Sequence, residues 1–375
     1  MKRIVSVALC IVLLISLSSC SDGNTGQPVL SYGEQSLSAN IFTFLLSQTK
    51  TMSLMSIGQM SDSVEFWDTP SGMVMAEYIM NDTISTAMSL AYYADCAVKS
   101  GFVIEKEDEK LIKSAVDTMM EGYGMTKQEF NVYMSQFGMD YNSLADYYRL
   151  QTLATYGKTL VLGEGGTYPI TDDDCLEYYK ENYVTLRHIN LNNINKVEAN
   201  GKTIPLTEQE KAQVNAQADD IQKALEEGHD ITEFASLSTD KTIQLYPAGV
   251  TIPVTDVLYE LASAWGESKN QEFNAFELYW YLLNSVEGFA EFILGAEQNQ
   301  IKRLDTTSGI FFLEKLPLDM EMYEVFKGVI YNGGAVEPEK TKALMKELEP
   351  EFVIDTLVLN SFTVKGAAVM PISAN

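Results

Sequence analysis

The chain has 375 residues, 46% of them hydrophobic, and a formal net charge of -26 at pH 7. A chain of this length and apolar content is expected to form two or three domains with packed cores. Because proteins hold nucleic-acid phosphates through Lys and Arg side chains, so acidic a chain is not expected to bind nucleic acid.

The N-terminus predicts a signal and a membrane anchor. A Lys-Arg pair precedes an apolar stretch, residues 5–17, that is too short to form a stable transmembrane helix. The following Leu-Ser-Ser-Cys resembles a bacterial lipobox, which implies removal of residues 1–19 and attachment of lipid to the sulfur of Cys20. The alternative is an ordinary signal peptide with an incidental cysteine. Residues 20–28 are small and polar and predict a flexible tether.

Residues 29–182 predict a mainly helical domain. They open with a short strand and a glycine turn at Gly33, and Thr126 and Glu129 have the spacing of a capping box. Apolar residues recur with helical spacing along several further segments. The expected helices are 39–57, 73–99, 105–120, one that follows Thr126, 141–162, and one that opens at Thr171.

Methionines are frequent in this helical region and allow two interpretations. Either they pack in the core, or part of them forms an exposed groove of methionine and aromatic side chains for unfolded chains, because methionine adapts its shape to varied partners. The residues concerned are Met52, Met55, Met60, Met119, Met120, Met125, Met134 and Met139.

The next region begins with the most informative stretch of the sequence. A β-branched run from Tyr183 contains His188, and a helix starts at the capping box of Thr207. A short apolar turn then leads into a Ser-Thr-Asp loop that ends at Asp240. The segments expected beyond it are a strand at 243–252, helices at 256–264 and 273–283, a hairpin at 300–304 and 310–315, helices at 320–330 and 340–348, and a strand-like end at 352–364.

The order of these parts resembles that of the SurA/PrsA-type extracytoplasmic foldases, and the stretch from Tyr183 to Asp240 resembles the first half of a parvulin-type peptidyl-prolyl isomerase domain. The resemblance implies an α+β fold. A mainly helical chaperone domain would be formed by residues 29–182 together with a returning C-terminal segment, residues 318–375. The inserted parvulin-like domain, residues 183–317, would hold a small antiparallel sheet flanked by helices.

The same resemblance implies site residues. His188 fits the first parvulin histidine and Asp240 the acidic or thiol position beside it, so both are candidate catalytic residues. Phe311, which follows Gly309 in the expected closing strand, stands where the second histidine would be. Parvulins are thought to use a polar network under an apolar proline pocket, so the loss of one histidine implies reduced or no isomerase activity. Taken alone, His188 also fits a hydrogen-bonded core histidine, and Asp240 a turn residue.

The function that the resemblance implies is a membrane-anchored folding factor or chaperone outside the cytoplasm, whose partners are unfolded or secreted polypeptides. Two alternatives come from other classes. A solute-binding lipoprotein of a transporter would need two lobes of alternating strands and helices, and a scaffold lipoprotein would have no catalytic role. The chain has two histidines, and no Ser-His-Asp or Cys-His arrangement for nucleophilic catalysis is recognised in the sequence.

Cysteine and histidine usage predicts neither a cofactor nor a metal site. The sequence has no Cys-x-x-Cys pair and no His-rich cluster. Once the signal is removed, Cys96 and Cys175 remain beside the lipid-bearing Cys20. A Cys96–Cys175 disulfide is feasible outside the cytoplasm, and a small buried apolar role for Cys96 is the alternative.

Overall fold

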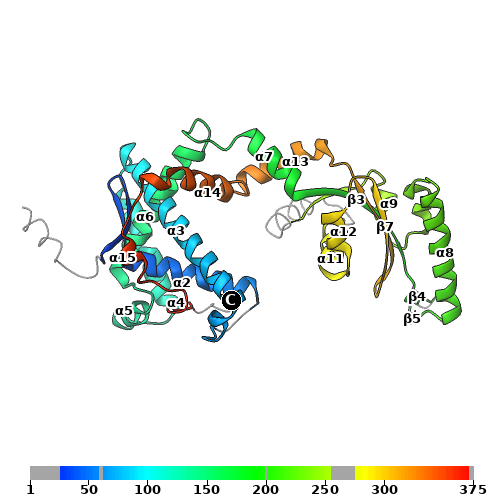
Figure 1. The fold of residues 1–375 in the computed structure, drawn as a ribbon, viewed down its shortest axis with the longest axis horizontal. Helices are drawn as coiled ribbons and strands as arrows, with labels where there is room; N and C mark the ends of the chain where they lie inside the picture. Colours follow the sequence, from blue (N-terminus) through cyan, green and yellow to red (C-terminus); the bar gives the residue numbers. More distant parts are fainter. Residues whose placement is uncertain (1–25, 59–61, 199–200, 255–274, 371–375) are drawn as a thin grey trace, which may run out of the picture. The chain divides into compact units, whose positions relative to one another are not determined.

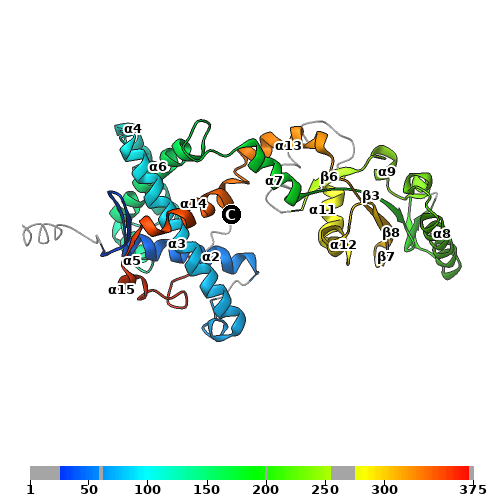
Figure 2. The same ribbon diagram turned by 45° about the horizontal axis from the view of Figure 1, so that its top comes forward.

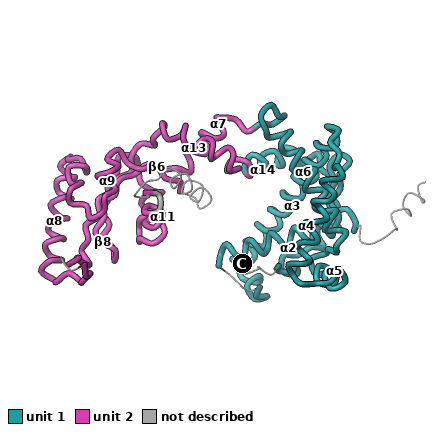
Figure 3. Tube along the Cα trace, turned by 180° about the vertical axis from the view of Figure 1, so that it is seen from behind, with its two compact units in different colours: residues 1–169, 339–375 teal, residues 170–338 magenta. Residues whose placement is uncertain are grey.

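The computed structural model describes residues 26–58, 62–198, 201–254 and 275–370, so the expected signal peptide and Cys20 lie outside the described residues. The chain divides into two compact units, coloured separately in Figure 3. Unit 1 combines the described residues up to Pro169 with those from Glu339 on, and unit 2 extends from Ile170 to Pro338. Both units combine helices with small antiparallel sheets, so the α+β class is confirmed.

Unit 1 is built mainly of helices that begin where the capping residues predict. Thr126 and Glu129 form the expected capping box. The longest helix starts earlier than expected, because the side chain of Thr69 accepts a hydrogen bond from the amide of Gly72 and Pro70 occupies the first helical turn. The helices, labelled in Figure 1, are α2 (Ala39–Ser56), α3 (Pro70–Lys99), α4 (Lys106–Gly122), α5 (Lys127–Ser135), α6 (Tyr141–Leu162) and α14 (Glu337–Leu348).

The closest helix contact in unit 1 joins α3 and α6 at a glycine. A Cβ atom added at Gly157 would lie 1.8 Å from the carbonyl oxygen of Tyr93 and 3.1 Å from the amide nitrogen of Ala97. No side chain fits at that separation, so Gly157 sets how closely the two helix backbones approach.

A small sheet of order β2-β1-β9 joins the two ends of unit 1: β1 is Pro28–Tyr32, β2 is Gln35–Ser38 and β9 is Val353–Ile354. The turn between β1 and β2 contains Gly33 with a φ of 56°. A carboxylate oxygen of buried Asp95 on α3 accepts a hydrogen bond from the amide of Glu34 at 3.0 Å, which ties this turn to the helix.

The C-terminal segment completes unit 1. The side chain of Lys50 on α2 is fully buried, and its Nζ atom donates to the carbonyl oxygen of Ala367 and to Asp62, each at 2.7 Å. The prediction of a strand at 352–364 is wrong beyond Ile354, where β9 ends. Asp355 instead accepts hydrogen bonds from two following amides and starts the short helix α15 (Thr356–Leu359).

Unit 2 is organised around a four-stranded antiparallel sheet of order β6-β3-β8-β7. The predicted hairpin is confirmed as β7 and β8, and the β-branched run forms β3. The strands are β3 (Tyr183–Leu191), β6 (Val250–Pro253), β7 (Gln300–Thr306) and β8 (Gly309–Leu316). A second, two-stranded hairpin in the polar connector, β4 (Asn195–Val197) and β5 (Thr203–Pro205), was not predicted.

Helices cover both faces of this sheet. On one face α8 (Glu208–Glu226), which begins at the predicted capping box, packs through Ile221 against Ile189 and Phe312 of the strands. On the other face lie α11 (Ala275–Ser285) and α12 (Phe289–Gly295), with Tyr279 and Phe289 in the core. Figures 1 and 2 show α8 on one side of the strands and α11 and α12 on the other.

One prediction in unit 2 requires correction, and another cannot be compared with the structure. The strand expected at 243–252 is instead the short helix α9 (Thr242–Leu245) followed by β6. The Asp240 carboxylate accepts a hydrogen bond from the amide of Thr242, a local turn contact that competes with extended structure. Gly249, with a φ of 94°, then turns the chain into β6. The helix expected at 256–264 lies outside the described residues, and α12 was not predicted.

The limits of unit 2 differ from the domain limits placed at 183 and 317. Helix α7 (Asp172–Asn182) and helix α13 (Met320–Asn332) belong to unit 2. The reason is a shared core, in which Tyr179 of α7 packs against Tyr183 of β3 and Phe326 of α13.

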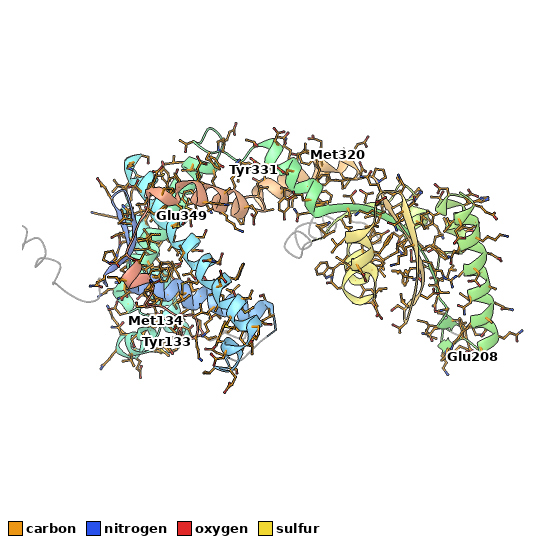
Figure 4. The ribbon with its side chains drawn as sticks, viewed as in Figure 1. Tyr133, Met134, Glu208, Met320, Tyr331 and Glu349 are labelled. Carbon is orange, nitrogen blue, oxygen red and sulfur yellow. The ribbon has the colours of Figure 1, made fainter. Side chains whose placement is uncertain are left out.

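The methionines of unit 1 divide between core and surface. Met134, shown beside Tyr133 in Figure 4, and Met139 are buried, whereas Met52 is 64% exposed. Met60 lies outside the described residues. Neither interpretation of the methionine pattern therefore holds for all of them.

Cys96 in α3 belongs to unit 1 and is half-buried, whereas Cys175 in α7 belongs to unit 2 and is buried. Among the helices described, none has both the length and the apolar composition needed to cross a membrane.

Candidate functional site

The candidate site lies on β3, where a loop replaces a neighbouring strand. β6 pairs with β3 only from Tyr183 to Leu186. Beyond that point the Ser-Thr-Asp loop follows the same edge, because the amide of Thr239 donates to the carbonyl oxygen of Asn190 at 2.7 Å. The hydroxyl of Ser238 also accepts a hydrogen bond from the Asn190 amide at 3.1 Å. This pairing places Asp240 beside His188.

His188 forms a hydrogen bond through each ring nitrogen. Its Nε2 lies 2.8 Å from Oδ2 of Asp240, and its Nδ1 lies 3.0 Å from the hydroxyl oxygen of Tyr279 on α11. The Tyr279 hydroxyl is also 3.3 Å from the carbonyl oxygen of Leu186, and the amide of Thr242 donates to Oδ1 of Asp240 at 2.9 Å. The three side chains form one chain of hydrogen bonds, which we call the His188 network: Asp240, His188 and Tyr279.

The His188 network satisfies the histidine in either protonation state. With Nε2 donating to Asp240, a neutral ring accepts the Tyr279 hydroxyl proton at Nδ1. A charged ring donates from Nδ1 to the hydroxyl oxygen, and Tyr279 then donates to the carbonyl of Leu186. His188 and Tyr279 have no exposed surface, and the Asp240 side chain is 17% exposed. A peptide outside the unit therefore cannot contact His188 in this conformation.

Phe311, which the resemblance sets at the place of the second histidine, is not part of the polar network. It pairs with Asn190 across β3 and β8, is 1% exposed, and its ring centre lies 6.1 Å from that of His188. The structure thus brings His188 and Asp240 together, and it places an apolar ring next to them. The second polar contact comes from Tyr279, which sequence reasoning missed.

Burial and hydrogen bonding act in opposite directions on the acid of the network. Burial alone would raise the pKa of the Asp240 carboxyl, but the hydrogen bond and charge of His188, with the amide of Thr242, hold that pKa below its usual range. Burial, and then the Asp240 charge, raise the pKa of Tyr279 well above its usual range, so its hydroxyl remains a donor.

Acidification is expected to destabilise unit 2 through Asp240. Because the Asp240 pKa is lower in the folded than in the unfolded chain, its stabilisation is present above the unfolded-state value of about 3.9 and is lost as the pH falls through the folded-state value. Urea unfolding of the protein and of Asp240→Asn, measured from about pH 2 to pH 7, should show a weaker acid dependence in the variant. Identical pH profiles would contradict this role.

Arg187, next to His188 in β3, points to the opposite face and holds loops to the sheet. Its guanidinium contacts Glu314 of β8 at 2.6 Å, the carbonyl oxygen of Pro247 at 2.9 Å and Asp230 at 3.0 Å. The second histidine of the chain, His229, is exposed and pairs with Glu233 at 2.9 Å, outside the His188 network.

Neither of two cavities in the described residues is lined by His188, Asp240 or Tyr279. A cavity of about 620 Å³ in unit 2 is lined by the first residues of β3, the end of β8 and the end of α12. A second, of about 490 Å³, lies between α4 and α6 of unit 1. Within the described ranges, no group of three His, Cys, Asp or Glu side chains is arranged to hold a metal ion.

The sequence matches no protein-family model and no curated protein. Among solved structures, it is similar to the peptidyl-prolyl isomerase PrsA of Bacillus anthracis, with 15% identity, 69% of this chain and 94% of that chain covered, and a TM-score of 0.25. It is also similar to the foldase PrsA of Streptococcus pneumoniae (13% identity, 80% and 84% covered, TM-score 0.21) and to PrsA of Bacillus subtilis (13%, 78% and 96%, TM-score 0.24). TM-scores this low support no argument about the function of this chain.

Proposed function

We propose that the protein is a folding factor of the SurA/PrsA type, which binds unfolded secreted polypeptides outside the cytoplasm and is held at the membrane by lipid on Cys20. The order of parts in the sequence and the two-segment construction of unit 1 support this proposal. The solute-binding alternative is disfavoured, because the described residues form one mainly helical unit and one antiparallel sheet instead of two lobes of alternating strands and helices.

The closed His188 network favours a binding role for unit 2 over catalysis. Isomerisation of a prolyl bond requires the peptide to contact groups that lower a barrier of about 18–20 kcal/mol. His188 has no exposed surface, and both of its nitrogens have partners inside the unit. We propose that these residues stabilise a parvulin-like sheet and that isomerase activity is reduced or absent.

Two measurements test the two halves of this proposal separately. In a proline-peptide isomerisation assay, the protein should raise the rate little or not at all above the uncatalysed one, and Asp240→Ala should leave that rate unchanged, because the network is closed to substrate. In an aggregation assay, the protein should delay the aggregation of an unfolded secreted client. Isomerase activity that is lost in Asp240→Ala would show an open catalytic site. Failure to delay the aggregation of any client would contradict the folding role.

A further inference from the structure

One end of unit 1 exposes an unusual group of large apolar side chains. Six of them, on the last part of α2 with the residue after it and on the first part of α3, are between 39% and 69% exposed. Exposed apolar residues that gather in one place mark interaction sites more often than single ones do. We call this group the apolar tip: Met52, Met55, Ile57, Met73, Val74 and Tyr78.

The two halves of the apolar tip are held next to each other by a buried cluster. Leu54 of α2 and Ile79 of α3 pack with Trp67, which lies in the segment between the helices. The exposed residues of the tip are sequence neighbours of these buried ones and lie on the outer faces of the same helices. In both views the end of α2 and the start of α3 are found at the same end of unit 1 (Figures 1 and 2).

The exposed charges around the apolar tip are mainly negative. Between Lys50 and Lys99 the sequence has no Lys or Arg, and it has six acidic residues. Glu65 and Glu77 are exposed, and Glu77 directly precedes Tyr78. Lys50 is buried, so its charge is not available at the surface. Lys365 does reach this region, where it pairs with Asp68 at 2.8 Å and its charge also acts on Glu65, so Glu77 is the carboxylate of the two without this neighbouring cation.

We propose that the apolar tip binds segments of unfolded polypeptide in which apolar side chains are flanked by Lys or Arg. This rests on the proposed folding function and names the class of client for it. Apolar client side chains that bind there are stabilised in proportion to the apolar surface that they remove from water. The three tip methionines, Met52, Met55 and Met73, adapt to different client shapes, and the carboxylates of Glu65 and Glu77 attract the flanking cations.

Charge also argues against two other occupants. A two-fold dimer through the apolar tip would bring the same carboxylates, Glu65 and Glu77, into opposition across the interface. An anionic membrane surface would repel them in the same way. A cationic and apolar polypeptide removes apolar surface from water without either penalty.

Peptide binding to the Cys20→Ser protein, which lacks the proposed lipid site, tests the assignment. Three fluorescent, unstructured peptides of equal length are compared: one of Leu, Phe and Lys, one with Glu in place of Lys, and one with Ser in place of Leu and Phe. The first should bind about tenfold more tightly than either of the others, which is a difference of about 1.4 kcal/mol. Its advantage over the Glu peptide should shrink at about 1 M salt, where the Debye length is near 3 Å.

Two sets of variants locate the site. Substitution of three exposed residues together, Met73→Ser, Val74→Ser and Tyr78→Ser, should weaken binding of the Lys peptide about tenfold, because these side chains contact the client. Glu65→Gln with Glu77→Gln should remove the preference for Lys over Glu. The matched control is Leu111→Ser with Val132→Ser, which changes equally exposed apolar residues on α4 and α5. The control should bind as the parent does.

The outcomes separate this inference from the folding function. Equal binding of the Lys and Glu peptides, or full binding by the triple tip variant, overturns the inference even if client aggregation is still delayed. Tip-dependent binding to phosphatidylcholine vesicles in place of the peptide would assign the tip to a membrane surface and also overturn it. If no client is protected from aggregation but the Lys peptide still binds at the tip, the folding function fails and the tip remains a peptide site.

Discussion

Replacement of His188 by alanine is expected to lower the free energy of unfolding of unit 2 by about 3–5 kcal/mol. The change removes the Nε2 partner of Asp240 and the Nδ1 partner of Tyr279, and it leaves an empty volume in a fully buried position. A buried carboxylate that loses its partner retains the cost of having left water. Urea titration combined with hydrogen–deuterium exchange of peptides from β3 and β8 measures the effect within unit 2.

The chain supplies a matched control for this change. His229→Ala removes the second histidine, which is exposed and pairs with Glu233 at the surface, and its stability should be close to that of the parent. A His188→Ala protein with unchanged exchange in β3 and β8 would show that the His188 network does not stabilise the sheet. Its function would then have to be sought in a conformation that exposes the ring.

Replacement of Gly157 by alanine is expected to destabilise unit 1 by about 3 kcal/mol, the upper part of the range for overpacked cores. The added methyl group would lie 1.8 Å from the carbonyl oxygen of Tyr93, so α3 and α6 must move apart. Backbone atoms cannot rotate away as a flexible side chain can. The shift in the urea midpoint of unit 1, followed by hydrogen–deuterium exchange of peptides from α3, measures the cost.

Gly122→Ala is the control for this second prediction. Gly122 is also helical, at the end of α4, and a Cβ atom there meets nothing within 4 Å. Alanine should therefore leave the stability unchanged or raise it by about 0.5 kcal/mol through its better helix propensity. Equal effects of the two substitutions would show that the contact between α3 and α6 does not limit the stability of unit 1.

Much of the fold was predictable because its signals are local. A capping box needs only a side chain and an amide three residues apart, and Thr126 and Thr207 start their helices as predicted. The hairpin of β7 and β8 likewise has its strands and turn in one short stretch. The apolar residues after Asp240 are fewer than a helix or strand pattern requires, so the hydrogen bond of Asp240 to the Thr242 amide decided between them.

The site was predictable only as far as the resemblance reached. His188 and Asp240 lie in the two segments whose order carries the resemblance, and the structure places them 2.8 Å apart. Tyr279 lies 91 positions from His188 on an aromatic-rich helix, and its neighbours in the sequence do not show which tyrosine faces the sheet. The burial of His188 could not be predicted from the sequence either, because it depends on α11 covering the face of the sheet on which His188 lies.

The division of unit 1 between the two ends of the chain has a consequence for biosynthesis. Lys50 and the Ala367 carbonyl that it contacts are 317 positions apart. Strand β1 can form its pairing with β9 only after the C-terminal segment has been synthesised. Unit 2 is continuous and can close as soon as it has been made, whereas the early helices remain incomplete until the last residues arrive. Because chains emerge from the N-terminus first, the apolar surfaces of unit 1 stay uncovered until the C-terminal segment has been made. Under the proposed function, the newly made chain is for that period itself a client of folding factors.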